Sequence, residues 1–346
     1  MRPFTYALAA DAPAAVRAAT VPADAHVRAP VQLMGGGTTL LDLMKLDVMR
    51  PETVVDITPL ATGHYGNIEA TAQGLRLGAL VRMSDAAEDK AVVRDYPVIA
   101  QSLGLAASQQ LRNMARLGGN ALQRTRCNYF RDTSYAQCNK RNPGSGCAAI
   151  DGFNRLHAVL GVSDACIAHY PGDFAQALIA LDATVEILGS SGARSIRFAD
   201  LHRLPGSTPH IETSLAPGEL ITAYVVPAGP WTRRSVYTKV RDRESYAFAL
   251  ASAAVALDMD GATVRSARIA LGGVAAVPWR AKEAEALLAG KPLDEAAATK
   301  AADAAFAGAK TNTHNAYKVP LGKATLVRAL LTAQAMPAPA AQERKV

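Results

Sequence analysis

All the cysteines of this chain lie in one short stretch, and this confinement constrains its fold and chemistry more than any other feature. The chain has 346 residues, and its four cysteines are Cys127, Cys138, Cys147 and Cys166. The residues between them are rich in arginine, asparagine, glycine and proline. Four unrelated thiols would leave unexplained why the rest of the chain has none. The stretch is therefore a candidate for a shared site.

Four interpretations fit the cysteine spacing, and the residues alone leave them open. A [4Fe-4S] cluster takes four thiolates and tolerates irregular spacing when its ligands lie on a wrapped loop. The cysteines could instead be unrelated buried thiols. Structural zinc usually shows close Cys-x2-Cys pairs, which are absent here. Two disulfides would require an oxidising compartment. We rank the interpretations in this order.

Two glycine segments precede the cysteines in a pattern that suits a bound phosphate. The first, Met34-Gly35-Gly36-Gly37-Thr38-Thr39-Leu40, follows an apolar strand expected at 31–34 and leads into a helix at 40–46. Glycines let the backbone approach an anion, and N–H groups at a helix start face it. The second segment is a turn, Gly118-Gly119-Asn120. Neither has the GxGxxG spacing, but two turns could clamp a dinucleotide pyrophosphate from two sides. The alternative is two plain turns.

The remaining pattern predicts an α+β chain with a main boundary at Pro227–Pro230. Before the boundary we expect strands at 4–6, 53–57, 68–72, 75–77, 184–188, 194–198 and 220–226, and helices at 12–19, 84–95, 98–106 and 174–181. After it we expect strands at 235–240, 248–257 and 264–271, then helices at 279–288, 293–307 and 313–335. The predicted domains are 1–60, 61–227 with an insertion at about 124–166, 228–331, and a tail at 332–346.

Composition and charge exclude several classes of protein. The net charge is +7, but lysine and arginine are scattered rather than gathered in a stripe with aromatics, so we do not expect nucleic-acid binding. A basic surface also suits an acidic partner or a pyrophosphate. No run of about 18 apolar residues exists, so we expect no membrane span. The first residues lack the apolar region of a signal peptide. We expect a cytoplasmic chain, unless it is exported folded with a signal-bearing partner.

The motifs, in their order, resemble the FAD-binding subunit of the molybdenum hydroxylases, the family of xanthine dehydrogenase and aldehyde oxidoreductase. The segments that carry the resemblance are 34–40, 112–120, 173–183, 237–241 and 268–274, within a match that covers residues 2–331. The resemblance implies a two-subdomain FAD-binding domain of the PCMH/VAO type. A small antiparallel sheet with a helical layer is expected to follow it.

The resemblance also implies a set of FAD contacts. They are Met34, Gly35, Gly36, Gly37, Thr38, Thr39, Leu40, Ala107, Arg116, Gly118, Gly119, Asn120, Gln123, Asp173, Leu220 and Lys239. Residues 34–40 and 118–120 would hold the pyrophosphate through backbone N–H groups, and Gln123 and Asp173 would bind nearby nucleotide or ribose hydroxyls. Lys239 would lie near the isoalloxazine, where a positive charge favours the reduced anionic flavin. Without the resemblance, Lys239 is better interpreted as a solvated lysine at a strand end.

The insertion from Arg124 to Cys166 departs from many family members. It resembles the subset whose flavin subunit carries an extra [4Fe-4S] cluster, as in bacterial periplasmic aldehyde oxidoreductases, and this implies that all four cysteines are ligands. Such enzymes are heterotrimers with a small [2Fe-2S] subunit and a large molybdopterin subunit. Their export signal lies on the small subunit, which implies a periplasmic chain by co-export; the alternative is the cytoplasm.

The implied function is electron transfer. Aldehyde and water would become carboxylic acid at the molybdenum of the large subunit, and electrons would pass through [2Fe-2S] centres to FAD and an external acceptor. The alternatives are a flavin subunit of a hydroxybenzoyl-CoA reductase-type enzyme, a zinc-braced scaffold, and a self-sufficient flavin oxidase. The seven histidines, His26, His64, His157, His169, His202, His210 and His314, show no ligand spacing. We interpret them as structural or surface residues.

Overall fold

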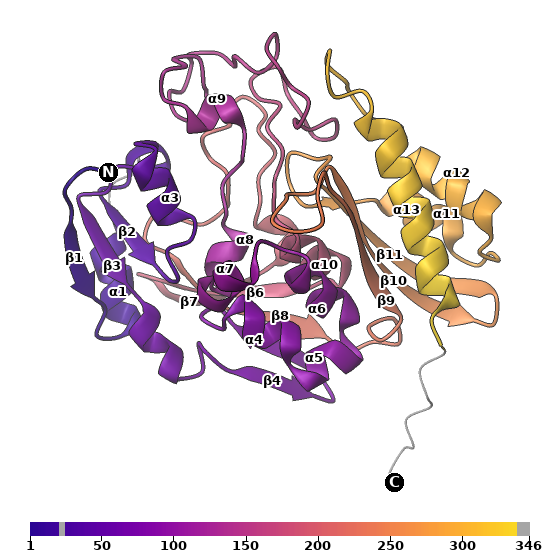
Figure 1. Cartoon of the computed structure of the whole chain (residues 1–346). Coiled ribbons are helices and arrows are strands. Elements are labelled where there is room, and N and C mark those ends of the chain that lie inside the picture. Colours follow the sequence, from indigo (N-terminus) through magenta and orange to yellow (C-terminus); the bar gives the residue numbers. More distant parts are fainter. Residues whose placement is uncertain (21–24, 338–346) are drawn as a thin grey trace.

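Three sheets organise the chain, one in each of the three ranges that we expect to form domains (Figure 1). The computed structural model of the protein describes residues 1–20 and 25–337. Most of the predicted tail, residues 338–346, lies outside the described residues. Its first residues, 332–335, form the end of the last helix. The fold has the α+β class predicted from the sequence.

The first sheet is parallel and positions the first glycine segment. Its order is β1 (Thr5–Leu8), β3 (Thr53–Asp56), β2 (Val31–Met34), and its helices are α1 (Ala12–Ala19), α2 (Ala25–Arg28) and α3 (Leu40–Lys45). The Asp11 side chain caps α1 by accepting a hydrogen bond from Ala14 N at 2.6 Å. Met34 pairs with Asp56 at the carboxyl ends of β2 and β3. The glycine segment therefore leaves from the carboxyl edge of this sheet.

The second sheet is antiparallel and carries the helices that surround the second glycine segment. Its order is β4 (Ile68–Thr71), β5 (Gly74–Gly78), β8 (Leu220–Pro227), β6 (Thr184–Gly189), β7 (Gly192–Arg197). Its helices are α4 (Met83–Glu88), α5 (Lys90–Asp95), α6 (Pro97–Gly104), α7 (Gln109–Met114), α8 (Leu117–Ala121) and α10 (Phe174–Ala180). Leu75, Leu178 and Tyr224 are fully buried between the sheet and these helices. This core fixes where α8 and α10 begin.

The third sheet has the antiparallel arrangement and helical layer that we predicted. Its order is β12 (Trp279–Arg280), β11 (Thr263–Gly272), β10 (Ala251–Asp260), β9 (Ser235–Val240). The helices α11 (Lys282–Leu288), α12 (Glu295–Ala305) and α13 (Lys318–Ala335) gather beside it in Figure 1. Alanines such as Ala253, Ala298 and Ala329 are fully buried in this layer. Their small side chains let the helices approach the sheet closely.

Three local predictions were wrong. The helix predicted at 84–95 is two helices, because Asp89 has an extended backbone and its side chain caps α5. Trp279 and Arg280 form strand β12 rather than the start of a helix, since they pair with β11. Residues 118–120 lie inside the short helix α8 and are not a turn.

The cysteine insertion has little regular structure. Within residues 124–166 the structure has one helix, α9 (Asn128–Arg131), and the chain otherwise runs as loops. Figure 1 shows these loops at the top of the molecule, projecting from the three sheets. In the described part of the chain, no helix has the length and apolarity needed to cross a membrane.

Candidate functional site

The two glycine segments lie directly against each other. A Cβ on Gly36 would lie 1.8 Å from the Met114 backbone oxygen, a distance that no side chain could tolerate. A Cβ on Gly35 would lie 3.1 Å from Cγ of Arg116. Gly37 has a φ of 71°, which favours glycine. The glycines of the first segment therefore allow it to pass against residues 114–116, just before α8.

The second segment offers fewer backbone donors than the sequence suggests. Gly118 N donates to the Ala79 oxygen at 2.8 Å, so this N–H is already satisfied. A Cβ on Gly118 would also meet Ala79, at 3.1 Å. Gly119 differs, because a Cβ there would have no neighbour within 4 Å. Of the two glycines, Gly119 is the one that faces open space.

Two cavities flank the paired glycine segments. The smaller, of about 310 Å³, is lined by Gly35, Arg116, Gly118, Gly119 and Leu220 from the predicted set. The larger, of about 750 Å³, is lined by Thr38, Thr39, Ala107, Asn120, Gln123 and Asp173 from that set. Met34, Gly36, Gly37, Leu40 and Lys239 line neither cavity. Most of the predicted residues thus line one or the other of the two cavities.

Unusual backbone marks the wall of the larger cavity. Ala107 has a φ of 49° and Tyr246 a φ of 53°, a region that L side chains rarely adopt. Both residues line the larger cavity. Arg112 Nη1 donates to the Ala106 oxygen at 2.7 Å and so holds the chain beside Ala107. Strained backbone of this kind gathers at functional sites, where the surrounding structure maintains it.

A buried ion pair lies behind the larger cavity. Asp173, at the start of α10, accepts from Tyr237 OH at 2.6 Å and from Lys239 Nζ at 2.8 Å. Lys239 Nζ also donates to the Leu105 oxygen at 3.0 Å. The side chains of Lys239 and Asp173 are only 1% and 4% exposed. Burial raises the pKa of Asp173, although Lys239 and Tyr237 act to lower it. The interpretation of Lys239 as a solvated lysine is therefore wrong.

Two arginines of the insertion tie it to the first sheet's domain at the larger cavity. Arg126 and Arg131 donate to Asp42 on α3 at 2.8 and 2.7 Å. The Arg126 guanidinium also stacks over the Phe248 ring, 4.7 Å from its centroid. All four of these residues line the larger cavity. Sequence reasoning missed them, since only the fold brings α3, the insertion and residue 248 together.

The four cysteines surround one small cavity inside the insertion, and all four are free thiols. Cys138 and Cys147 face each other across two short antiparallel segments. Burial raises the pKa of Cys127 to about 12, whereas a hydrogen bond with Cys166 lowers the pKa of Cys147 to about 6. In residues 1–20 and 25–337, no three His, Cys, Asp or Glu side chains are placed to hold a single metal ion.

A half-buried carboxylate joins the insertion to the second domain. Glu212 accepts from Arg124 Nε at 2.5 Å and from Lys140 Nζ at 2.7 Å. Burial alone would raise the pKa of Glu212, but the two cations outweigh it and lower the pKa to about 2. Lys140 also lines the cysteine cavity. Glu212 therefore helps to set the position of the cysteine loops.

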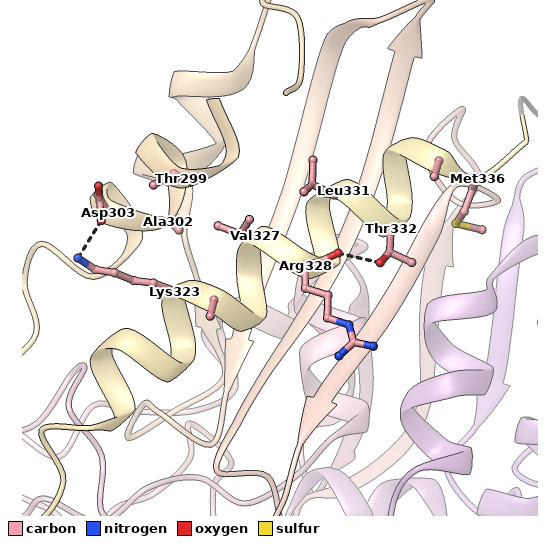
Figure 2. Close-up of a pocket in the computed structure, with 11 residues that line it drawn as sticks. Thr299, Ala302, Asp303, Lys323, Val327, Arg328, Leu331, Thr332 and Met336 are labelled. Atoms are coloured by element: carbon pink, nitrogen blue, oxygen red, sulfur yellow. Dashed lines mark hydrogen bonds and ion pairs between the residues drawn. The ribbon is translucent and has the colours of Figure 1, made fainter. Parts of the chain in front are cut away.

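A separate groove in the third domain is lined mainly by apolar side chains. A groove of about 850 Å³ lies between α12 and α13, with Ala302, Val327 and Leu331 among its lining residues (Figure 2). At one end, Lys323 Nζ is 2.8 Å from Asp303 Oδ1. The groove contains neither of the glycine segments and none of the cysteines. We place the functional site at the paired glycine segments, because close backbone approach and buried charge converge there.

Two family models match the chain. One, described as the FAD binding domain in molybdopterin dehydrogenase, matches residues 3–229. The other, described as the CO dehydrogenase flavoprotein C-terminal domain, matches residues 235–333. The resemblance stated from the sequence motifs is thereby confirmed.

Individual relatives cover three quarters of the chain or more. The chain is 48% identical over 338 residues to the aldehyde oxidoreductase FAD-binding subunit PaoB of Escherichia coli strain K12, which covers 97% of this chain and 99% of that protein. It is 27% identical over 262 residues to the glyceraldehyde dehydrogenase medium chain of Sulfolobus acidocaldarius, with 76% and 74% covered. The reconstituted CO dehydrogenase from Oligotropha carboxidovorans is 25% identical with a TM-score of 0.73, over 97% of this chain and 99% of that chain.

Proposed function

Because the chain belongs to the FAD-binding domain family of the molybdopterin dehydrogenases, we propose that it is the FAD- and [4Fe-4S]-binding electron-transfer subunit of a molybdenum-containing aldehyde oxidoreductase. The assembly would be a heterotrimer with a small [2Fe-2S] subunit and a large molybdopterin subunit. The large subunit would convert aldehyde and water to carboxylic acid. The E. coli relative, named as the FAD-binding subunit of an aldehyde oxidoreductase, is the observation that carries this proposal.

The paired glycine segments fit the pyrophosphate of FAD. They lie between two cavities, so an extended dinucleotide held at the glycines could place one end in each. Arg116 Nε and Asn120 Oδ1 are buried here and have no hydrogen-bond partner within the described residues. Such unpaired groups are costly unless a ligand satisfies them. When bound, FAD accepts two electrons together and can release them one at a time.

The size of the two cavities supports an assignment for the two ends of the cofactor. We assign the flavin ring to the larger cavity, with Ala107 and Gln123 in its wall, and the adenosine to the smaller one, beside Leu220. Both Asp173 carboxylate oxygens already accept hydrogen bonds from protein groups. Asp173 would therefore act mainly by holding Lys239. Since the pair is neutral overall, the lysine would favour a reduced anionic flavin less than an unpaired cation would.

The cysteine cavity suits an iron–sulfur cluster better than a single ion. A single ion needs ligands that converge on one point, whereas a cluster takes its four thiolates around a larger body. A hydrogen bond with Cys147 and burial raise the pKa of Cys166, and Lys140 beside the cavity acts against this rise. Bound iron would keep all four thiols deprotonated. The ligands would be Cys127, Cys138, Cys147 and Cys166.

The cysteine site adjoins the proposed flavin site. Arg126 lines the larger cavity, and the next residue in the chain is Cys127. His169 lines the larger cavity too, three residues after Cys166. Adjacent residues are about 3.8 Å apart between Cα atoms, so only a short distance of chain separates the two sites. This proximity supports electron exchange between them.

Exposed apolar side chains at the larger cavity suit a partner subunit. Tyr246 is 57% exposed, Phe248 42% and Leu156 38%, and all three line this cavity. A docked partner would remove their apolar surface from water, which favours association.

We propose co-export of the assembled trimer to the periplasm, with the cytoplasm as the alternative. Cell fractionation of the tagged chain, with and without its partners, tests this location.

The function is tested with the trimer, made by expressing the chain together with the proposed small [2Fe-2S] and large molybdopterin subunits. Aldehyde added under anaerobic conditions should bleach the flavin absorbance of the trimer. The isolated, FAD-loaded chain should stay oxidised under the same conditions, because the substrate chemistry would lie on the partner. Bleaching of the isolated chain would contradict the proposal, as would a trimer whose flavin no aldehyde reduces.

A further inference from the structure

One histidine of the insertion contacts a cysteine that we assign to the cluster. His157 Nε2 lies 3.1 Å from Cys127 Sγ, and His157 is only 4% exposed. The two residues are 30 positions apart in the sequence, so no local motif predicts the contact. Our interpretation of His157 as a structural or surface residue left this contact out.

The backbone around His157 fixes the position of its ring. His157 N donates to the Asn154 oxygen at 3.0 Å, and Asn154 Nδ2 donates to the Ala149 and Ile150 oxygens at 3.1 Å each. The next residue, Ala158, donates to the Ile167 oxygen at 2.9 Å, beside Cys166. The ring is therefore held between the two ends of the insertion, at the cysteine cavity.

In the described part of the chain, Cys127 Sγ is the one hydrogen-bond partner of His157 Nε2. Within the described residues, the second ring nitrogen, Nδ1, is buried and has no hydrogen-bond partner. The Tyr129 ring is 6.2 Å away between centroids and makes only a tilted contact. A proton on Nε2 can be shared with Cys127 Sγ, whereas a proton on Nδ1 would be buried without an acceptor. The geometry thus favours the tautomer with its N–H on Nε2.

We propose that His157 donates a hydrogen bond from Nε2 to the Cys127 thiolate, holds this ligand in place and raises the reduction potential of the iron–sulfur cluster. An N–H group that points at a ligand sulfur stabilises the more negative, reduced form of a cluster. His157 is then a positioning residue, since it acts through Cys127. The inference rests on the cluster in the proposed function.

The position of Cys127 gives this hydrogen bond a consequence for electron transfer. Arg126, the preceding residue, is in the wall of the larger cavity, so Cys127 is the ligand joined most directly to the proposed flavin site. A higher cluster potential favours electron flow from the reduced flavin to the cluster. Loss of the hydrogen bond would make that step less favourable.

Two variants in the trimer test the inference. His157→Leu removes the hydrogen-bond donor with little change in side-chain volume. His157→Gln keeps an N–H group near the position of Nε2. Iron, acid-labile sulfide and FAD are measured for each, and the cluster potential is followed by electron paramagnetic resonance during a redox titration. The matched control is His210→Gln, since His210 lies outside the cysteine cavity.

We expect His157→Leu to keep its iron and FAD and to show a lower cluster potential. His157→Gln should return the potential toward that of the unmodified trimer, and His210→Gln should leave it unchanged. An unchanged potential in His157→Leu would overturn the inference. Loss of iron from both His157 variants, with FAD retained, would also overturn it, because His157 would then act as a ligand. An unmodified trimer without this iron would instead remove the cluster from the proposed function.

Discussion

The glycine cleft, meaning the paired glycine segments at 34–40 and 118–120 with the two cavities beside them, is held in shape by other forces than the cysteine insertion at 124–166. In the cleft, backbone packs against backbone, as at Gly36 and Met114, and residues from all three domains line the two cavities. The insertion has one short helix and depends on side-chain pairs such as Lys140 with Glu212. The folded core therefore preforms the cleft, whereas the insertion needs its ligands and ion pairs. Changes in the two regions should have separable effects.

The largest effect is expected from Gly36→Ala, which should disrupt the cleft itself. The new Cβ would lie 1.8 Å from the Met114 oxygen, so one of the two segments must move. We expect a loss of about 4 kcal/mol in the free energy of unfolding, because the clash is with backbone. FAD should bind roughly 100-fold more weakly, a change of about 2.7 kcal/mol. Chemical denaturation and FAD titration measure the two effects.

Gly119→Val is the matched control for this change. A Cβ at Gly119 meets nothing within 4 Å, so the variant should fold with nearly unchanged stability. It should still lose FAD, because the side chain would fill the space that the pyrophosphate approaches. Full FAD content in Gly119→Val would show that Gly119 does not contact the pyrophosphate. The first glycine segment would then be the proposed pyrophosphate site.

Cys138→Ser should affect the insertion and spare the cleft. We expect loss of the cluster iron, because metal binding and local folding are coupled. The insertion should become sensitive to protease, while FAD content stays at one per chain, since Asp42 rather than the cysteines holds Arg126 and Arg131 at the larger cavity. Iron analysis and limited proteolysis test both points. Normal iron content in this variant would show that Cys138 is not a ligand.

Lys239→Met should destabilise the protein by about 3 kcal/mol, because it leaves the Asp173 carboxylate buried without its cation. The double variant Lys239→Met with Asp173→Asn should recover most of this loss, since no buried charge remains. Thermal unfolding of the two single variants and the double variant gives the coupling energy. A loss in the double variant equal to the sum of the losses in the two single variants would show that the ion pair contributes no coupling.

Glu212→Gln should have the smallest effect, about 2 kcal/mol at neutral pH, and the effect should depend on pH. The folded pKa is depressed from 4.5 to about 2, so the stabilisation is complete above pH 4.5. It is lost as the pH falls toward 2. Unfolding free energies of the two proteins should therefore converge between pH 4.5 and pH 2. A difference that stays constant over this range would contradict the assignment.

The sequence predicted the parts of the fold that local signals determine. The strand, glycine segment and helix at 31–46 have such signals, as does the helix at 12–19, and each is present in the structure. The family followed from ordered motifs and is confirmed by the matching family models. The glycines at 118–120 misled us, because tertiary pairing of Gly118 with Ala79 keeps them in a helix.

Long-range contacts account for what the sequence did not reveal. The burial of Lys239 depends on Asp173, which is 66 residues away. Arg126 meets Asp42 across 84 residues, and His157 meets Cys127 across 30. A single sequence has no local pattern for such pairs, because the fold alone brings them together. The roles that the resemblance gives to individual FAD contacts remain predictions.

The cofactor content of the chain is the most direct test of the account. Iron, acid-labile sulfide and FAD should be measured per chain on the trimer, purified anaerobically, with the small subunit's iron counted separately. The account predicts about four irons, about four sulfides and one FAD on this chain. FAD without iron would contradict the cluster and leave a flavoprotein with four unliganded cysteines, and the absence of both cofactors would contradict the electron-transfer role itself.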